Sequence, residues 1–145
     1  MNIKQFLTRP ILLLYSTAYG QTDFEITKLL AAKGDAFAQY NLGVMYENGE
    51  GVPENDADAV KWYRLAAEQG NANAQYNLGD MYYSGDGVPQ NNVRAYVWWS
   101  VAAAQGREDA KNNRDIVSVR LKPDQRARGQ EIAAKCFESD YQDCE

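Results

Sequence analysis

The chain has 145 residues, a net charge of −5 at neutral pH and no histidine. An acidic surface repels phosphate backbones, so we expect no nucleic-acid partner. Without histidine, no Ser-His or Cys-His nucleophile and no His-ligated zinc site can be built, so we expect no catalysis, no metal ion and no cofactor. No apolar run is long enough to cross a bilayer, so stable membrane insertion is not expected.

The N-terminal stretch MNIKQFLTRPILLLYSTAYGQ has the layout of a secretory signal peptide. Its only charges are basic, Lys4 and Arg9, and a short apolar core leads to small residues at positions 18 and 20. We therefore expect residues 1–20 to be removed before Gln21, which predicts a periplasmic or secreted protein. The alternative is an N-terminal helix that stays on a cytosolic protein.

Two nearly identical segments follow. GVPENDADAVKWYRLAAEQG occupies 51–70 and GVPQNNVRAYVWWSVAAAQG occupies 87–106, an offset of 36 residues. The similarity extends upstream, so one unit covers 34–69 and its copy covers 70–105. Self-similarity at such a period is typical of repeat proteins.

Each unit divides into two helices, because its apolar residues recur at spacings of three and four. The second helices carry Trp62 and Tyr63 in one copy and Trp98 and Trp99 in the other. This recurrence favours a hydrophobic core over a platform for a cofactor or sugar. Residues that suit helix N-caps stand at equivalent positions of both units, namely Asp35, Asn55, Asn71 and Asn91.

Gly43 and Gly79 lie inside the first helices of the two units. A glycine at such a position costs about 1 kcal/mol relative to alanine, so it needs a structural reason. We expect the reason to be a close approach between helices, in which Trp62 or Trp98 packs against the bare backbone.

The repeat register continues on both sides of the two full units. Residues 21–33 are predicted to form an N-terminal half repeat, 106–137 a degenerate repeat with a C-terminal cap, and 138–145 a tail. The second helix of the second unit carries extra apolar residues, Tyr96, Val97 and Val101. Either the C-terminal helices cover these residues or they form an exposed patch for a partner.

The pattern A-x-x-x-L-G-x-x-Y, followed by G-x-G-V-P-x-N and A-x-x-W-x-x-x-A-A-x-x-G, resembles the Sel-one-like repeat family. That family is related to the tetratricopeptide repeats. The resemblance implies an all-α fold, a right-handed α/α solenoid of antiparallel helix pairs whose first helices line a concave groove. It also implies a non-catalytic adaptor of the bacterial envelope that binds a protein or an extended peptide. We expect the chain to be monomeric on its own.

Helical phase selects the side chains that would face this groove. They mix aromatic, amide and acidic groups, which suits an extended peptide with some positive charge. The candidates are Phe37, Tyr40, Asn41, Val44, Glu47, Asn73, Tyr76, Asn77, Asp80, Tyr83 and Asn112. The asparagines at 41, 77 and 113 recur at one repeat position, where they would either reach a ligand backbone or bond locally within the repeat.

A different function would use the acids Glu47, Glu50, Asp80 and Asp86. They would make the chain a ligand-binding protein or an enzyme that acts on cell-wall material. Glycoside cleavage requires two carboxylates that face each other across a sugar ring. Nothing in the sequence places these acids in that geometry, so this function stays the alternative.

Cys136 and Cys144 are the chain's two cysteines, eight positions apart. In an oxidising compartment they would form a disulfide that pins the tail to the last helix. In the cytosol they would remain two reduced thiols.

Overall fold

The computed structural model describes residues 22–145, so the predicted signal peptide at 1–20 lies outside the described residues. The described part contains helices and turns but no strand. An N-terminal helical segment at 22–32 precedes six further helices. These are α2 (Ala36–Asn48), α3 (Asp56–Glu68), α4 (Ala72–Ser84), α5 (Asn92–Ala104), α6 (Glu108–Ser118) and α7 (Pro123–Glu138).

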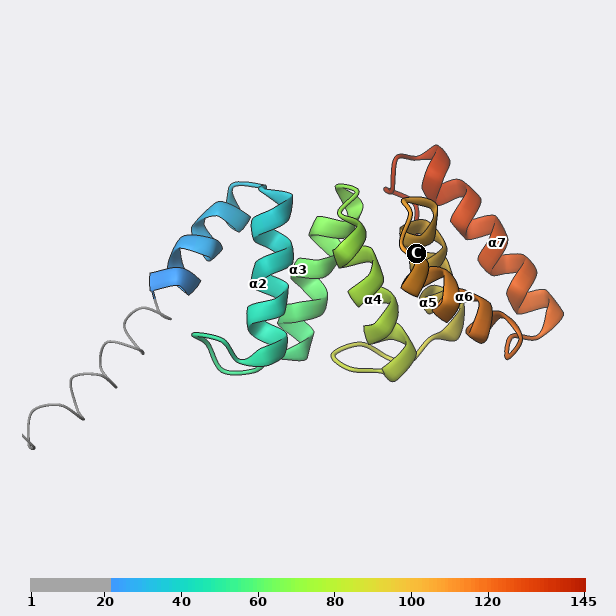
Figure 1. Cartoon of the computed structure of the whole chain (residues 1–145), viewed down its shortest axis with the longest axis horizontal. Helices are drawn as coiled ribbons and strands as arrows, with labels where there is room; N and C mark the ends of the chain where they lie inside the picture. The colour runs from blue at the N-terminus through green and yellow to red at the C-terminus, as the bar shows by residue number, and fades with distance from the viewer. Residues whose placement is uncertain (1–21) are drawn as a thin grey trace, which may run out of the picture.

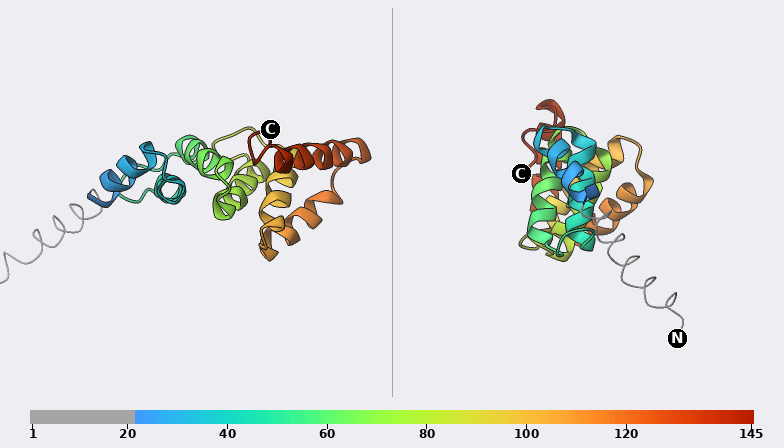
Figure 2. Two further views of the ribbon diagram at one scale, coloured as in Figure 1. Left: turned by 90° about the horizontal axis from the view of Figure 1, so that it is seen from above. Right: turned by 90° about the vertical axis from the view of Figure 1, so that its left-hand side faces the viewer.

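Successive helices pack as antiparallel pairs, α2 with α3 and α4 with α5, and the pairs stack through contacts between α3 and α4. Figure 1 shows the pairs following one another along the long axis of the molecule. Figure 2 shows the same elongated array from above and from its N-terminal end. The predicted all-α solenoid of helix pairs is therefore confirmed.

The four predicted N-caps are formed as the repeat register requires. Each cap side chain accepts a hydrogen bond from the backbone N–H three residues further on, at 2.7 Å for Asp35, 3.0 Å for Asn55, 2.9 Å for Asn71 and 3.1 Å for Asn91. Gly49 and Gly85 end α2 and α4 with φ of 70° and 81°, which a residue without Cβ adopts without strain. Local sequence thus sets where these helices begin and end.

A buried glutamine joins each first helix to the second helix before it. In the second repeat, Gln75 is fully buried and its Nε2 donates to the Ala67 carbonyl oxygen at 3.1 Å, while its Oε1 accepts from Gln105 Nε2 at 2.6 Å. The same arrangement occurs 36 residues earlier. There Gln39 Nε2 donates to the Ala31 carbonyl oxygen, and Gln69 Nε2 donates to Gln39 Oε1 at 2.7 Å. These bonds satisfy amides that would otherwise be costly to bury, and sequence reasoning did not single them out.

The two helix-interior glycines are sites of close approach, but their predicted partners are wrong. A Cβ on Gly43 would lie 2.5 Å from the Tyr63 ring, and a Cβ on Gly79 would lie 2.6 Å from the Trp99 ring. The contacting residues are therefore Tyr63 and Trp99, each one position after the expected tryptophan. One residue along a helix turns the side chain by about 100°, which points Trp62 toward the N-terminal cluster and buries Trp98 in the main core.

We expect Gly79→Ala to lower the free energy of unfolding by about 1–2 kcal/mol. The added methyl group overpacks against Trp99, and this destabilises the fold by more than the higher helix propensity of alanine stabilises it. Chemical denaturation measures the change, and Asn112→Ala at an exposed position of α6 serves as the control with a near-zero effect. An unchanged or higher stability for Gly79→Ala would contradict the close-approach explanation.

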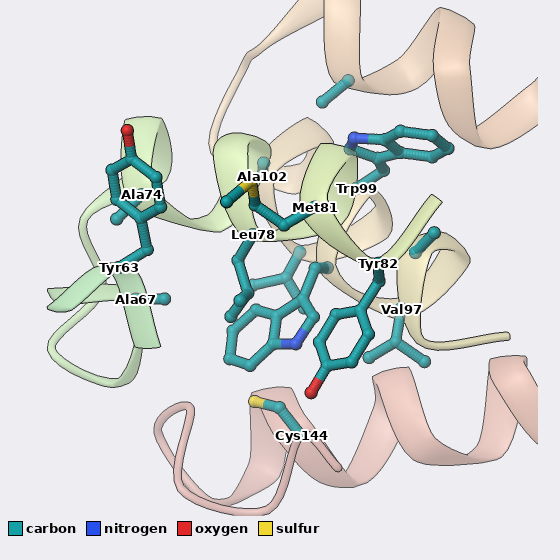
Figure 3. Close-up of a cluster of buried hydrophobic side chains, with 14 of the residues drawn as sticks. Tyr63, Ala67, Ala74, Leu78, Met81, Tyr82, Val97, Trp99, Ala102 and Cys144 are labelled. Atoms are coloured by element: carbon teal, nitrogen blue, oxygen red, sulfur yellow. The ribbon is translucent and has the colours of Figure 1, made fainter. Parts of the chain in front are cut away.

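The main hydrophobic core runs without a break from α3 to the C-terminal segment. Figure 3 shows its central part, in which Tyr63 comes from α3, Leu78 and Tyr82 come from α4, and Val97 comes from α5. A second, smaller cluster joins the N-terminal helical segment to α2 through Phe24, Ala31, Ala38 and Leu42. Because each helix pair buries its face against its neighbours, the repeats form one cooperative array.

The C-terminal helices cover the extra apolar face of α5. Val97 and Val101 are fully buried, and α7 packs along α5. A Cβ on Gly129 of α7 would lie 2.8 Å from the Tyr96 ring, so this glycine lets the cap approach closely. Of the two alternatives for these residues, coverage by the cap is the one that the structure shows.

Candidate functional site

The first helices α2, α4 and α6 carry the predicted groove residues along one face, which we call the groove face. Its N-terminal part is an aromatic run from Phe37, which is 64% exposed, through the half-buried Tyr40 to Tyr63. The ring centroids of Phe37 and Tyr40 are 6.5 Å apart, and those of Tyr40 and Tyr63 are 6.0 Å apart. Tyr40 and Val44 also pack on the main core, so this part of the face is rigid.

Tyr63 reaches the groove face from α3 because Gly43 leaves room for its ring. Its hydroxyl donates a hydrogen bond to Glu47 and also bonds the Asn77 side chain. Burial raises the pKa of Tyr63, and the Glu47 carboxylate raises it further. The phenol therefore stays protonated and holds the Glu47 carboxylate in place.

Trp99 repeats this arrangement one unit later with a different acid. Its Nε1 donates to Asp80 Oδ1 at 3.0 Å, and Asn113 Nδ2 lies 3.3 Å from the Tyr76 hydroxyl and 3.5 Å from Asp80 Oδ1. Burial raises the pKa of Asp80, whereas the hydrogen bonds from Trp99 and Tyr76 lower it. The carboxylates of Glu47 and Asp109 raise it further, so three successive first helices contribute to one negative field.

In the third unit, the asparagine at the recurring position does not make the local bond that was one of its two alternatives. Asn113 contacts Tyr76 and Asp80, which belong to the preceding unit, rather than bonding within its own repeat. It thereby orients groove side chains across the boundary between α4 and α6.

Two arginines stand at the C-terminal part of the groove face. Arg107 lies over the Tyr76 ring at 4.3 Å from its centroid, donates to Asn73 Oδ1 at 2.6 Å and pairs with Asp109. Arg120 donates to the Tyr83 hydroxyl. These charges face a surface that is otherwise acidic, so they limit where a basic ligand side chain can lie.

The position of Arg107 has a signal in the sequence that we did not use. Arg107 follows Asn71 by 36 residues and so occupies the N-cap position of α6, where it forms no side-chain cap bond. A residue that cannot cap, at a position where the other units cap, is free to extend over Tyr76. Aligning the degenerate unit with the two full repeats identifies Arg107 as the residue that replaces a capping asparagine.

A cleft of about 420 Å³ lies between α4 and α6 on the groove face. Ile116 is 52% exposed at its edge, and the rings of Tyr83 and Trp99 lie 5.5 Å apart on one wall. Its full lining is Asp80, Tyr83, Ser84, Asp86, Trp99, Asn113 and Ile116. Apolar walls with two carboxylates suit a side chain that ends in a positive charge.

Most predicted groove residues come together, with two departures. The residues that take part in the contacts above are Tyr40, Glu47, Asn73, Tyr76, Asn77, Asp80 and Tyr83. Phe37 and Val44 lie at the N-terminal part of the groove face, where Asn41 is half-buried. Asn112 is exposed and makes none of these contacts, which its neighbour Asn113 makes instead. Tyr63 and Trp99 were assigned to the core alone, although each also donates to a groove carboxylate.

The four acids of the alternative function do not all converge in one place, since Asp80 and Asp86 line the cleft but Glu47 and Glu50 do not. Glu47 and Asp80 are each bonded to an aromatic donor, while Glu50 accepts from Asn48 Nδ2 at 3.1 Å. Within residues 22–145, no group of three His, Cys, Asp or Glu side chains could hold a metal ion. In the same part of the chain, no helix has the length and apolar character needed to cross a membrane.

The fold defines the class: an α/α-solenoid repeat protein, here with a cleft between α4 and α6. The family model for the Sel1 repeat matches residues 36–71 and 72–106. Through these two repeats the chain belongs to the Sel1 repeat family, whose members typically serve as protein-interaction adaptors. No curated protein matches the chain.

Solved structures with the same fold include two Sel1-type repeat proteins. One is a protective antigen present in uropathogenic Escherichia coli strains, which displays an SLR fold. It is 34% identical in sequence with a TM-score of 0.77, and the match covers 83% of this chain and 26% of the antigen. The other is a Sel1 repeat protein from Oxalobacter formigenes, 27% identical with a TM-score of 0.68, over 97% of this chain and 66% of that protein. The chain thus spans about a quarter of the first protein and about two thirds of the second.

Proposed function

We propose that this protein is a non-catalytic adaptor of the bacterial envelope that binds an extended segment of another protein through the groove face. The observation that carries the proposal is that side chains of successive first helices share one face: Tyr40 beside the Tyr63 ring, Tyr76 bonded by Asn113, and the cleft that Asn113 and Trp99 line. Rigid aromatic groups at the centre of a groove usually supply much of the binding energy.

The charge of the groove face indicates the kind of segment. The carboxylates of Glu47 and Asp109 act electrostatically on Asp80, and Asp86 lies with Asp80 at the cleft. Arg107 and Arg120, on either side of α6, lie over the Tyr76 and Tyr83 rings of the same face. A segment that places an apolar residue beside Ile116 and a lysine or arginine beside Asp80 satisfies both features.

The envelope location rests on two features that are independent of the groove. The N-terminal stretch has the layout of a signal peptide, and Cys136 is bonded to Cys144 in the structure. Disulfides persist in oxidising compartments such as the periplasm or the extracellular space. A structural relative that is a protective antigen of a pathogenic bacterium agrees with this location.

We expect the Tyr40→Ala, Tyr76→Ala double variant to bind a groove peptide at least about tenfold more weakly, because both aromatic anchors are lost. Peptides are first selected from a displayed random library on residues 21–145, and their affinities are then measured by fluorescence polarisation. Selection should enrich lysine or arginine next to an apolar residue.

The matched control is Lys61→Ala on the exposed face of α3, which should change affinity less than about twofold. Circular dichroism must show equal helix content for all variants. A loss of binding in Lys61→Ala with normal binding in the double tyrosine variant would place the site on the opposite side of the solenoid.

A further inference from the structure

The chain reverses direction after α7 and returns its last residue to the middle of the array. Asp140 and Tyr141 adopt φ of 54° and 69°, a left-handed conformation that is uncommon for residues with a Cβ. The Tyr141 N–H donates to the Cys136 carbonyl oxygen at 2.7 Å, and the Cys136–Cys144 disulfide closes the turn. A strained turn persists where surrounding contacts hold it, and here it delivers Glu145 to α3 and α5.

The Glu145 side chain is held by three groups from three different helices. Its carboxylate accepts from Arg64 Nε of α3 at 3.0 Å, from Arg94 Nη1 of α5 at 3.1 Å and from the Tyr82 hydroxyl of α4 at 2.6 Å. Figure 3 shows the Tyr82 hydroxyl directed toward the tail segment that carries Cys144. Charge-assisted bonds from two guanidinium groups to one carboxylate are among the stronger polar contacts in proteins.

The three groups are also joined to one another. Arg64 Nη2 and Arg94 Nη1 lie 2.7 Å and 3.1 Å from the Tyr82 hydroxyl oxygen, and the Arg94 guanidinium lies 5.5 Å from the Tyr82 ring centroid. Tyr82 is almost fully buried, so it fixes the position of the cluster on the core. Burial raises the pKa of Tyr82, so its hydroxyl stays protonated and can donate to an anion.

Two like charges that converge on one point require an anion between them. Among the described residues, Glu145 is the sole ion-pair partner of both Arg64 and Arg94. The two arginines sit on helices that the repeat core holds in place, whereas Glu145 sits on a tail of few residues. The binding geometry is therefore a property of the solenoid. Because Cys144 is buried and disulfide-bonded, the part that can leave the cluster is the Glu145 side chain.

Solvent and a ligand can reach this cluster. The side chains of Arg64 and Arg94 are 33% and 38% exposed, and that of Glu145 is 28% exposed. A cleft of about 680 Å³ opens beside it between the start of α5, α7 and the tail. Arg128 and Lys135 of α7 lie along this cleft together with Asp124, Glu131 and Asp143.

We propose that Arg64, Tyr82 and Arg94 form a second binding site, specific for a carboxylate on an acidic segment of a partner protein, and that Glu145 blocks this site in cis. None of the three residues belongs to the groove set, so this proposal stands apart from the groove function. A tethered carboxylate acts at a high effective concentration, so an acidic partner binds well only when the Glu145 carboxylate is displaced.

The test compares Glu145→Gln with the unchanged protein, both as residues 21–145 with the disulfide intact. The ligand is a fluorescein-labelled peptide of glutamate and glycine, and its glutamine counterpart measures binding that does not need the carboxylates. A tail that occupies the site nine-tenths of the time raises the apparent Kd about tenfold. We therefore expect Glu145→Gln to bind the glutamate peptide about tenfold more tightly, with an affinity that falls as salt is added.

Two further variants separate this site from a general charge effect. Glu54→Gln removes the same charge from an exposed turn and should leave peptide affinity unchanged. Adding Arg64→Gln and Arg94→Gln to Glu145→Gln should abolish the gain, with helix content unchanged by circular dichroism. Equal affinities for Glu145→Gln and Glu54→Gln would overturn the proposal, as would a gain that survives without the two arginines.

Discussion

Replacing Trp98 by alanine is expected to lower the free energy of unfolding by about 3–5 kcal/mol, the largest loss of any single substitution considered for this protein. Trp98 is fully buried in the main core, so alanine would remove a large packed side chain and leave a cavity among its neighbours. Chemical denaturation followed by circular dichroism measures the change. Because the core is continuous from α3 to the C-terminal segment, unfolding should remain a single transition that shifts to lower denaturant.

Trp62 is the matched control for this substitution. It occupies the position 36 residues earlier in the repeat but is only partly buried, against the smaller cluster near the N-terminus. Trp62→Ala should therefore cost clearly less than Trp98→Ala. Equal losses at the two positions would show that repeat register, rather than burial, determines the contribution of each tryptophan.

Trp98→Phe gives a second check on the same site. The indole Nε1 of Trp98 is buried and has no hydrogen-bond partner within the described residues. An unpaired buried N–H costs free energy, so removing it offsets part of the lost packing. We expect Trp98→Phe to cost much less than Trp98→Ala.

Removal of the disulfide, by Cys136→Ala with Cys144→Ala, is expected to lower the free energy of unfolding by about 2–3 kcal/mol. The bond closes a loop between positions eight apart, and small loops restrict the unfolded chain less than large ones, which places the loss in the lower part of the usual range. Both cysteines are buried, so alanine is preferred over serine because it adds no polar group. The loss is measured by urea denaturation of oxidised protein.

Reductant supplies the control for this double variant. Dithiothreitol should lower the stability of the unchanged protein toward that of the double variant and should leave the variant itself unaffected. Thiol titration of denatured protein purified from its native host should detect no free thiol before reduction. Two titratable thiols in that sample would contradict both the disulfide and the export that we propose.

The fold was predictable because its determinants are local and repeated. The N-caps at Asp35, Asn55, Asn71 and Asn91 act through bonds that span three residues, and the glycines after the helices act through their own φ angles. The period of 36 residues supplied each signal twice. Such patterns specify helices, their ends and the face that each helix buries without reference to the rest of the chain.

The candidate site was predictable in outline, since helical phase identified the exposed face of α2 and α4. It was less predictable in α6, whose unit departs from the repeat. There the phase pointed to Asn112, whereas Asn113 makes the contacts to Tyr76 and Asp80. In that unit the N-cap is Arg107, which forms no cap bond and lies over Tyr76.

The sequence by itself determined that this protein is an all-α repeat array, where the helices of its two full repeats begin and end, and that Gly43 and Gly79 allow close packing. Only the tertiary structure decided that Tyr63 and Trp99 fill the space beside those glycines, because that choice depends on how two helices are rotated about their axes. Only the tertiary structure brought Glu145 to Arg64, 81 positions away, and to Arg94 and Tyr82. Contacts of that kind depend on how the chain reverses at Asp140 and Tyr141 and on how successive repeats stack, and neither leaves a periodic signal in the sequence.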